Sequence, residues 1–110
     1  MNILVRHQSN NLVIAPAGRL DSVNAPILDQ KLTSVIERGE TRLVIDLSAI
    51  DYISSKGLAA LLSAAKKLRL AEGRFVLAGI KDPVRTVMEI SGLNKIFTIF
   101  PNVEAAVLNS

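Results

Sequence analysis

A short apolar strand that leads into an amphipathic helix constrains this fold more than any other feature. Residues 42–47, RLVIDL, are apolar and β-branched in their centre, as is typical of a strand buried on both faces. Apolar residues then return with helical spacing at Leu58, Leu61, Leu62, Ala65 and Leu68. This spacing predicts a helix with one buried face, which begins close to Ser55 and ends at Gly73.

Strand-like and helix-like segments alternate along the rest of the chain. Residues 3–6 and 12–15 read as a hairpin with a polar turn, and residues 75–78 and 96–100 read as two further strands. Further helices are expected from Ser22 or Asn24 to Gly39, from Asp82 to Gly92, and after Pro101.

This alternation predicts an α/β fold with a mixed β-sheet, an N-terminal hairpin and about four helices. Its parallel strands require right-handed helical crossovers. We expect the helices to cover the core mainly on one side and to leave the Ser55 end of the sheet open.

Composition favours one small domain that spans residues 1–110. The chain is 49% hydrophobic, and a domain of this size buries roughly 65% of its unfolded surface. It has no cysteine, which removes disulfides and thiolate metal sites and agrees with a cytoplasmic location. The apolar run before Arg6 is too short for a signal peptide, and no later stretch approaches a membrane span. We therefore expect neither export nor membrane insertion.

The net charge of +3 raises the question of nucleic-acid binding. The densest basic cluster consists of Lys66, Lys67, Arg69 and Arg74. The chain has four aromatic residues, one Tyr and three Phe, and no evident platform on which bases could stack. A solvated helix face explains the cluster better, so we predict no direct contact with nucleic acid.

The sequence offers no set of residues for catalysis. The single histidine, His7, lies on an expected edge strand without a clustered nucleophile or orienting acid. Asp46 follows a buried strand, and Asp51 is expected in a loop as a local turn acceptor. There is no phosphate-binding glycine loop. We predict a protein that is not an enzyme and needs no cofactor or metal.

Two adjacent serines lie where the central strand leads into the helix. Ser55 is the better candidate for the N-cap, which would place its hydroxyl among backbone N–H groups that lack intrahelical partners. Such a hydroxyl is exposed and open to modification. The simpler alternative is that Ser54 and Ser55 serve only the turn and the helix cap, worth about 1 kcal/mol.

The segment around these serines resembles the signature of the STAS domain family, in particular the bacterial anti-sigma factor antagonists. The family pattern is an apolar strand, D-S-S-G-L and an apolar helix; this chain has Ser54, Ser55, Lys56, Gly57 and Leu58. Aligned on the Gly-Leu pair, the family's phosphorylated serine falls on Ser55, its aspartate on Ser54 and its second serine on Lys56. Residues 18–28 and 90–107 also match, so the resemblance covers nearly the whole chain.

The resemblance implies a partner switch controlled by phosphorylation. Unphosphorylated at Ser55, with Ser54 as second choice, the protein would bind an anti-sigma factor that is also a serine kinase, and a sigma factor would be released. Phosphorylation would end this binding, and a separate protein phosphatase would restore it. The partner-binding surface would comprise Asp21, Ser54, Ser55, Lys56 and Gly57.

Several alternatives stay open from the sequence. Asp21 is either a helix cap or a partner contact, and Gly57 either allows close approach of a partner or relieves the backbone. Lys56 is a candidate to pair with a phosphate on Ser55. A different role for the whole domain is that of a non-switching STAS adaptor in a lipid-transport or other membrane-associated complex. Small-ligand or nucleotide sensing has no support from the residues.

Overall fold

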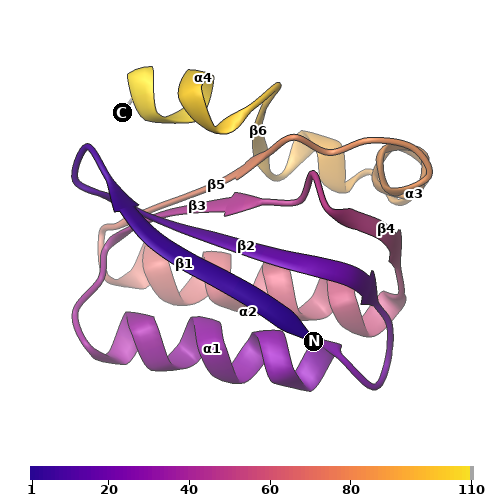
Figure 1. Ribbon diagram of the computed structural model, residues 1–110, viewed down its shortest axis with the longest axis horizontal. Helices are drawn as coiled ribbons and strands as arrows, with labels where there is room; N and C mark the ends of the chain where they lie inside the picture. Colours follow the sequence, from indigo (N-terminus) through magenta and orange to yellow (C-terminus); the bar gives the residue numbers. More distant parts are fainter. Residues whose placement is uncertain (110) are drawn as a thin grey trace.

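A six-stranded mixed sheet forms the centre of the computed structural model, which describes residues 1–109 (Figure 1). The strands are β1 (Asn2–Gln8), β2 (Asn11–Leu20), β3 (Arg42–Asp46), β4 (Ile50–Ile53), β5 (Arg74–Ala78) and β6 (Thr98–Phe100). Their order is β1-β2-β3-β5-β6, and β4 pairs with the far end of β2. Within residues 1–109 only the β1–β2 pair is antiparallel, because at least one helix lies along the chain between the two strands of every other pair. The predicted mixed sheet with an N-terminal hairpin is confirmed.

Four α-helices accompany the sheet. They are α1 (Ala25–Glu37), α2 (Ser55–Leu70), α3 (Val84–Ser91) and α4 (Val103–Leu108), with one 3₁₀ turn at Leu93–Lys95. The first two lie side by side on one face of the sheet, and α4 lies on the other (Figure 1). Both α1 and α2 begin at the same end of the molecule, close to the end of β2.

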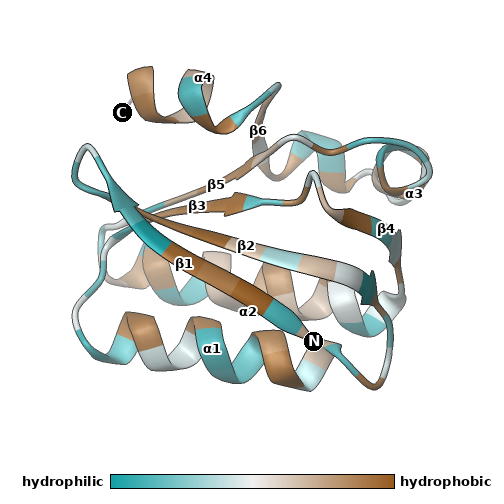
Figure 2. Cartoon of the chain, in the orientation of Figure 1, coloured by the Kyte–Doolittle hydropathy of each residue, from teal (hydrophilic) through white to brown (hydrophobic). Residues whose placement is uncertain are grey.

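The larger hydrophobic core lies between the sheet and the α1–α2 pair. Ile14, Leu43, Ile45, Leu61 and Leu68 are fully buried in it. Apolar residues follow the first half of β2 and most of β3 and β5, whereas the end of β2 and the β1–β2 turn are hydrophilic (Figure 2). Because both faces of β3 are covered, its residues are apolar in succession rather than alternately.

A second, smaller apolar cluster lies under α4. Val13, Val44 and Val76 point to this face from three neighbouring strands and pack with Ala106. The expectation that helices cover mainly one side therefore needs a correction, because the short terminal helix gives the opposite face a core of its own.

β4 corrects the sequence prediction, which placed Asp51 and Tyr52 in a loop. The strand pairs in parallel with the end of β2, where Gly18 lies opposite Ile50 and Leu20 opposite Ile53. The register shifts next to Gly18, whose φ of 104° suits glycine, and β2 continues to Leu20, past residue 15, where the sequence prediction ended this strand. Local sequence missed β4 because only its two terminal residues are buried.

The glycines predicted to end the helices take a left-handed conformation after α1 and α3 but not after α2. Gly39 and Gly92 take the predicted left-handed conformation after α1 and α3. After α2 it is Glu72 that has a positive φ, 57°, and not Gly73. Gly73 is instead needed for close packing, since a Cβ there would lie 2.5 Å from the carbonyl oxygen of Thr41. The terminal helix is capped by Asn102, which follows Pro101.

Asp82 does not cap α3 as expected. The helix begins one residue after Pro83 and has no side-chain cap. Asp82 Oδ1 instead accepts a hydrogen bond from the Thr86 hydroxyl at 3.3 Å, one turn along the helix.

Candidate functional site

The two adjacent serines have different positions at the start of α2. Ser54 is the N-cap: its backbone is extended, and its Oγ accepts a hydrogen bond from the Gly57 N–H at 3.2 Å. The same hydroxyl donates to the carbonyl oxygen of Leu20 at 3.2 Å, and the Ser54 N–H donates to that oxygen at 2.9 Å. The prediction that Ser55 is the N-cap is therefore wrong. Ser54 caps the helix because its backbone can also pair with the end of β2.

Ser55 is the first residue of α2 and is exposed. Within residues 1–109 its hydroxyl makes no hydrogen bond, in contrast to that of Ser54. The neighbouring Lys56 is also exposed. The structure thus places an unengaged hydroxyl and a flexible cation together at a helix start, where backbone dipoles favour negative charge.

Gly57 is buried against the fold itself. A Cβ at this position would lie 2.8 Å from both Cγ and the carbonyl oxygen of Leu20, and 3.0 Å from Ile53 Cγ1. Its lack of a side chain therefore lets α2 approach β2 and β4. That the missing Cβ of Gly57 also admits a partner stays a prediction, because the atoms that the structure places there belong to Leu20 and Ile53.

The loop between β2 and α1 is closed by Asp21. One carboxylate oxygen, Oδ1, accepts hydrogen bonds from the N–H groups of Val23 at 3.1 Å and Asn24 at 2.9 Å. Asn24 is the N-cap of α1 without a side-chain cap bond; its amide donates to the carbonyl of Arg19 at 2.8 Å. Of the two roles predicted for Asp21, that of helix cap is wrong, because Asn24 is the N-cap; the Asp21 carboxylate instead closes the turn that precedes the helix. Partner contact stays a prediction.

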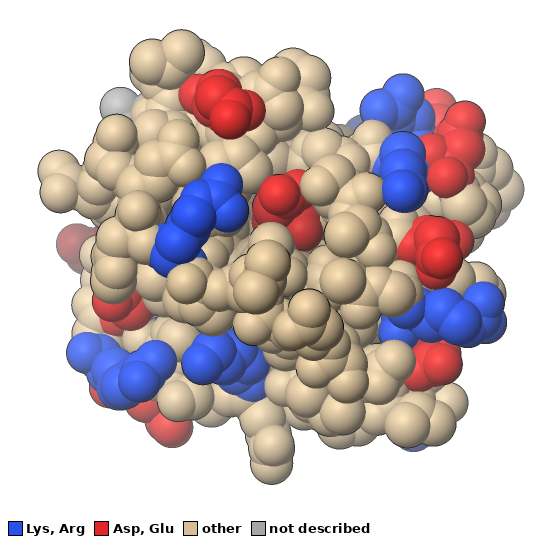
Figure 3. All heavy atoms as spheres, in the orientation of Figure 1, with Lys and Arg blue, Asp and Glu red and all other residues tan. Residues whose placement is uncertain are grey.

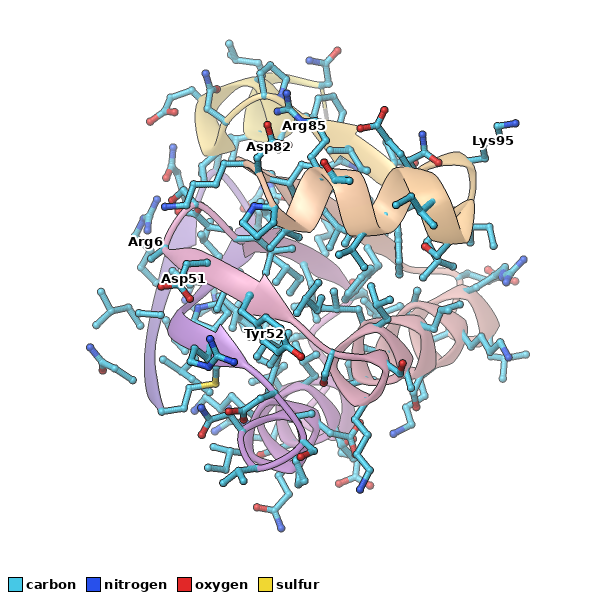
Figure 4. All side chains as sticks on the ribbon, turned by 90° about the vertical axis from the view of Figure 1, so that its right-hand side faces the viewer. Arg6, Asp51, Tyr52, Asp82, Arg85 and Lys95 are labelled. Atoms are coloured by element: carbon cyan, nitrogen blue, oxygen red, sulfur yellow. The ribbon has the colours of Figure 1, made fainter. Side chains whose placement is uncertain are left out.

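Arg19 and Tyr52 form a contact beside this loop that sequence reasoning missed. The Arg19 guanidinium carbon lies 4.1 Å from the centre of the Tyr52 ring, and Arg19 Nε lies 3.9 Å from Asp21 Oδ2. Tyr52 and Asp51 project from β4 at the end of the molecule where α1 and α2 begin (Figure 4). The parallel register brings Arg19 opposite Tyr52, so only recognition of β4 could have predicted this pair.

A hollow of about 320 Å³ lies between the first turns of α1 and α2. It is lined by Ala25, Pro26, Asp29, Lys56, Ala59, Ala60 and Ser63. Small side chains on both helices leave this space open, and Lys56 and Asp29 supply opposite charges at its wall. The surface next to Ser55 is therefore concave and carries both apolar and charged side chains.

His7 lies far along the sheet from the serines. It pairs with Leu12 at the start of β2, whereas Ser54 bonds to Leu20 at the end of that strand. Its Nε2 is 3.3 Å from Glu40 Oε2, and 68% of its side chain is exposed, as expected of an edge residue. Within residues 1–109, no three acidic or histidine side chains are grouped in a way that could hold a metal ion.

The family model of the STAS domain matches residues 2–106 of this chain. The chain belongs to the STAS domain family. Within residues 1–109 of this STAS domain, no helix is both long enough and hydrophobic enough to cross a membrane.

Relatives of this STAS domain carry regulatory names. It is 43% identical over 95 residues to the Bordetella bronchiseptica protein named "Putative anti-sigma factor antagonist BtrV", covering 86% of this chain and 82% of that protein. The crystal structure of an anti-sigma factor antagonist from Mycobacterium paratuberculosis is 30% identical, with a TM-score of 0.90 over 98% of this chain and 92% of that one. The Bacillus cell fate determinant SpoIIAA in its phosphorylated form shares the fold, at 21% identity and a TM-score of 0.76, covering 98% of both chains.

Proposed function

We propose that this protein is an anti-sigma factor antagonist that acts as a partner switch controlled by phosphorylation of Ser55. Without phosphate, it binds an anti-sigma factor that is also a serine kinase, and a sigma factor is released. With phosphate on Ser55, this binding is lost until a protein phosphatase removes the group. The domain performs no chemistry itself.

The observation that carries this proposal is the contrast between the two serine hydroxyls. Ser54 uses its Oγ both as donor and as acceptor within the fold, so a phosphate there would break the cap. Ser55 Oγ is exposed and makes no hydrogen bond within residues 1–109. Modification of Ser55 therefore leaves the helix start intact. This supports Ser55 over Ser54 as the phosphorylation site.

The names of similar proteins support the same role. The relatives with 43% and 30% identity are both named as anti-sigma factor antagonists. SpoIIAA, which has the same fold, is known in a phosphorylated form. These names make an anti-sigma factor the first partner to test.

The surface around Ser55 suits a docking site that a phosphate can disable. The proposed docking surface lies at one end of the molecule, beside the hollow between α1 and α2. It comprises Asp21 in the loop before α1, and Ser54, Ser55 and Lys56 at the start of α2. Val23 follows Asp21 with 74% of its surface exposed and supplies an apolar contact. Gly57 contributes by holding α2 against β2 and β4.

The switch follows from electrostatics at the interface. A phosphoserine carries a charge of about −2 and three acceptor oxygens. On the free protein this charge is tolerated at the start of α2, where the helix dipole and Lys56 favour an anion. In a docked complex the same charge must be desolvated, which costs ~3–5 kcal/mol when it has no partner. The domain itself need not refold.

The test is incubation of this protein with ATP and a candidate anti-sigma factor kinase from the same organism. We expect phosphate incorporation at Ser55, located by mass spectrometry, in the parent and in the Ser54→Ala variant, and none in Ser55→Ala. The last two variants are matched, because each removes one hydroxyl. Binding to the kinase without phosphorylation of either serine would favour the non-switching adaptor role instead.

A further inference from the structure

A second hollow, of about 520 Å³, lies at the opposite end of α2 from Ser55. It is bordered by the last turns of α2, the start of β5, β6 and Asn109, which follows α4. Its lining residues are Leu62, Ala65, Lys66, Arg69, Gly73, Arg74, Phe75, Val76, Ile96, Thr98, Phe100 and Asn109. The volume is within the range of natural binding sites.

The charge of this hollow has one sign. Lys66, Arg69 and Arg74 line it, and none of its lining residues, all within residues 1–109, is an Asp or Glu. Within residues 1–109, the two close contacts between basic and acidic side chains join His7 to Glu40 and Arg19 to Asp21. Neither involves a cation of the hollow. On the face seen in Figure 3, by contrast, basic and acidic side chains are interspersed.

Arg74 is held in a fixed position within the hollow. Its guanidinium donates to the carbonyl of Ala106 at 3.1 Å and to Asn11 Oδ1 at 3.5 Å, and lies 5.6 Å from the centre of the Phe100 ring. Burial, and then the nearby charge of Arg42, lower the pKa of Arg74. An anion in the hollow would favour the charged form of Arg74 and so oppose both effects.

The hollow also offers apolar surface and an open strand edge. Leu62, Phe75 and Ile96 line it, and 62% of Ile96 is exposed. β6 pairs only with Val76–Ala78 of β5, so no strand of residues 1–109 covers Arg74 and Phe75 on that side. Cationic and aliphatic side chains thus alternate around an exposed piece of sheet.

We propose that this hollow binds an acidic peptide segment of a partner protein, one in which carboxylates are interspersed with aliphatic side chains. The carboxylates would pair with Lys66, Arg69 and Arg74, and the aliphatic side chains would pack on Leu62 and Ile96.

The two aromatic residues of the lining, Phe75 and Phe100, are engaged within the fold, Phe75 with the ring of Phe97 and Phe100 with the guanidinium of Arg74. They therefore offer no free stacking platform of the kind that nucleic-acid bases require, which favours a peptide. Three residues of the basic cluster, Lys66, Arg69 and Arg74, would therefore form a binding site, whereas Lys67 lies outside the hollow and donates to the Thr33 hydroxyl.

This site is independent of the Ser55 surface. Ser55 and Arg69 are separated along α2 by a helix length of about 21 Å, at 1.5 Å per residue. A partner can therefore occupy either end, or both ends together. Charge changes at one end should leave binding at the other unaltered, apart from long-range electrostatics that salt screens.

Fluorescence anisotropy with a labelled eight-residue peptide of alternating Glu and Leu tests the proposal. We expect saturable binding that weakens with salt and at least tenfold weaker binding by the Lys66→Glu, Arg69→Glu double variant. The control is the Arg38→Glu, Lys81→Glu double variant, which makes the same change of net charge at exposed residues outside the hollow; it should bind within twofold of the parent.

Two further measurements decide between alternatives. Ile96→Ser should also weaken binding at least tenfold, because it removes the aliphatic wall without changing the charge of the hollow. Equal losses in the two charge-reversal variants would overturn the proposal, because they would show only general electrostatic attraction. An Ile96→Ser variant with parental affinity would overturn it as well, because the aliphatic contact would then contribute nothing. Tighter binding of a single-stranded oligonucleotide of equal charge than of the peptide would assign the hollow to nucleic acid instead.

Discussion

Gly57 packs so closely on Leu20 that a β-carbon at residue 57 would lie 2.8 Å from both the Cγ and the carbonyl oxygen of Leu20. The Gly57→Ala substitution should therefore destabilise the protein by about 1–3 kcal/mol, as is typical of overpacking. In an unhindered helix the same change would be stabilising by about 1 kcal/mol. Urea denaturation distinguishes the two signs. The control is Lys56→Ala at the exposed neighbour, expected within about 0.5 kcal/mol of the parent.

Ser54→Ala should lower stability by about 1–2 kcal/mol, because it removes the cap of α2. It also removes the donor to the carbonyl of Leu20. Ser54→Asp restores an acceptor for the Gly57 N–H but not this donor, so its stability should lie between those of Ser54→Ala and the parent. Denaturation curves for the three proteins provide the comparison. An unchanged midpoint for Ser54→Ala would contradict the capping role.

Ser55→Asp should weaken binding to the cognate kinase by about a hundredfold or more, because docking buries an unpaired charge. Ser55→Ala should bind like the parent and resist switching. Both variants should melt close to the parent, since the cap is provided by Ser54. Calorimetry measures the affinities. If Ser55→Asp binds as tightly as the parent, charge at this position does not control docking.

Substitutions at Asp21 separate its two candidate roles. Asp21→Asn keeps an oxygen that can accept from the Val23 and Asn24 N–H groups but removes the negative charge. We expect its stability to be close to that of the parent and its affinity for the kinase to fall about tenfold. Asp21→Ala should in addition lose ~1 kcal/mol of stability with the turn bonds. An Asp21→Asn variant with parental affinity would restrict Asp21 to closing the loop.

The elements that the sequence predicted best are those with a strong local pattern. α1 and α2 show helical spacing of apolar residues, and β3 is a continuous apolar run buried by helices on both faces. Their existence follows from period and composition alone. β4 lacks both signals, since its identity depends on pairing with Arg19 and Leu20, more than 30 positions earlier. Contacts of this kind are set by topology and not by the local sequence.

The candidate site shows the same division. The sequence located the start of α2 to within one residue, but two adjacent serines have equal propensity to cap a helix. What decides between them is the carbonyl oxygen of Leu20, which receives both the N–H and the hydroxyl of Ser54. The Arg19–Tyr52 contact is another product of tertiary pairing and had no local signal.

Because Ser54 anchors α2 to the end of β2 while Ser55 remains unengaged, the two positions should behave as different classes of allele in the cell. Substitutions at Ser54 should act through protein abundance, so their phenotypes should soften at lower temperature or on overexpression. Substitutions at Ser55 should leave abundance unchanged and alter only the response to the signal, in a direction set by the charge of the new side chain. A mutant collection could therefore assign the two serines by immunoblot, before any partner has been purified.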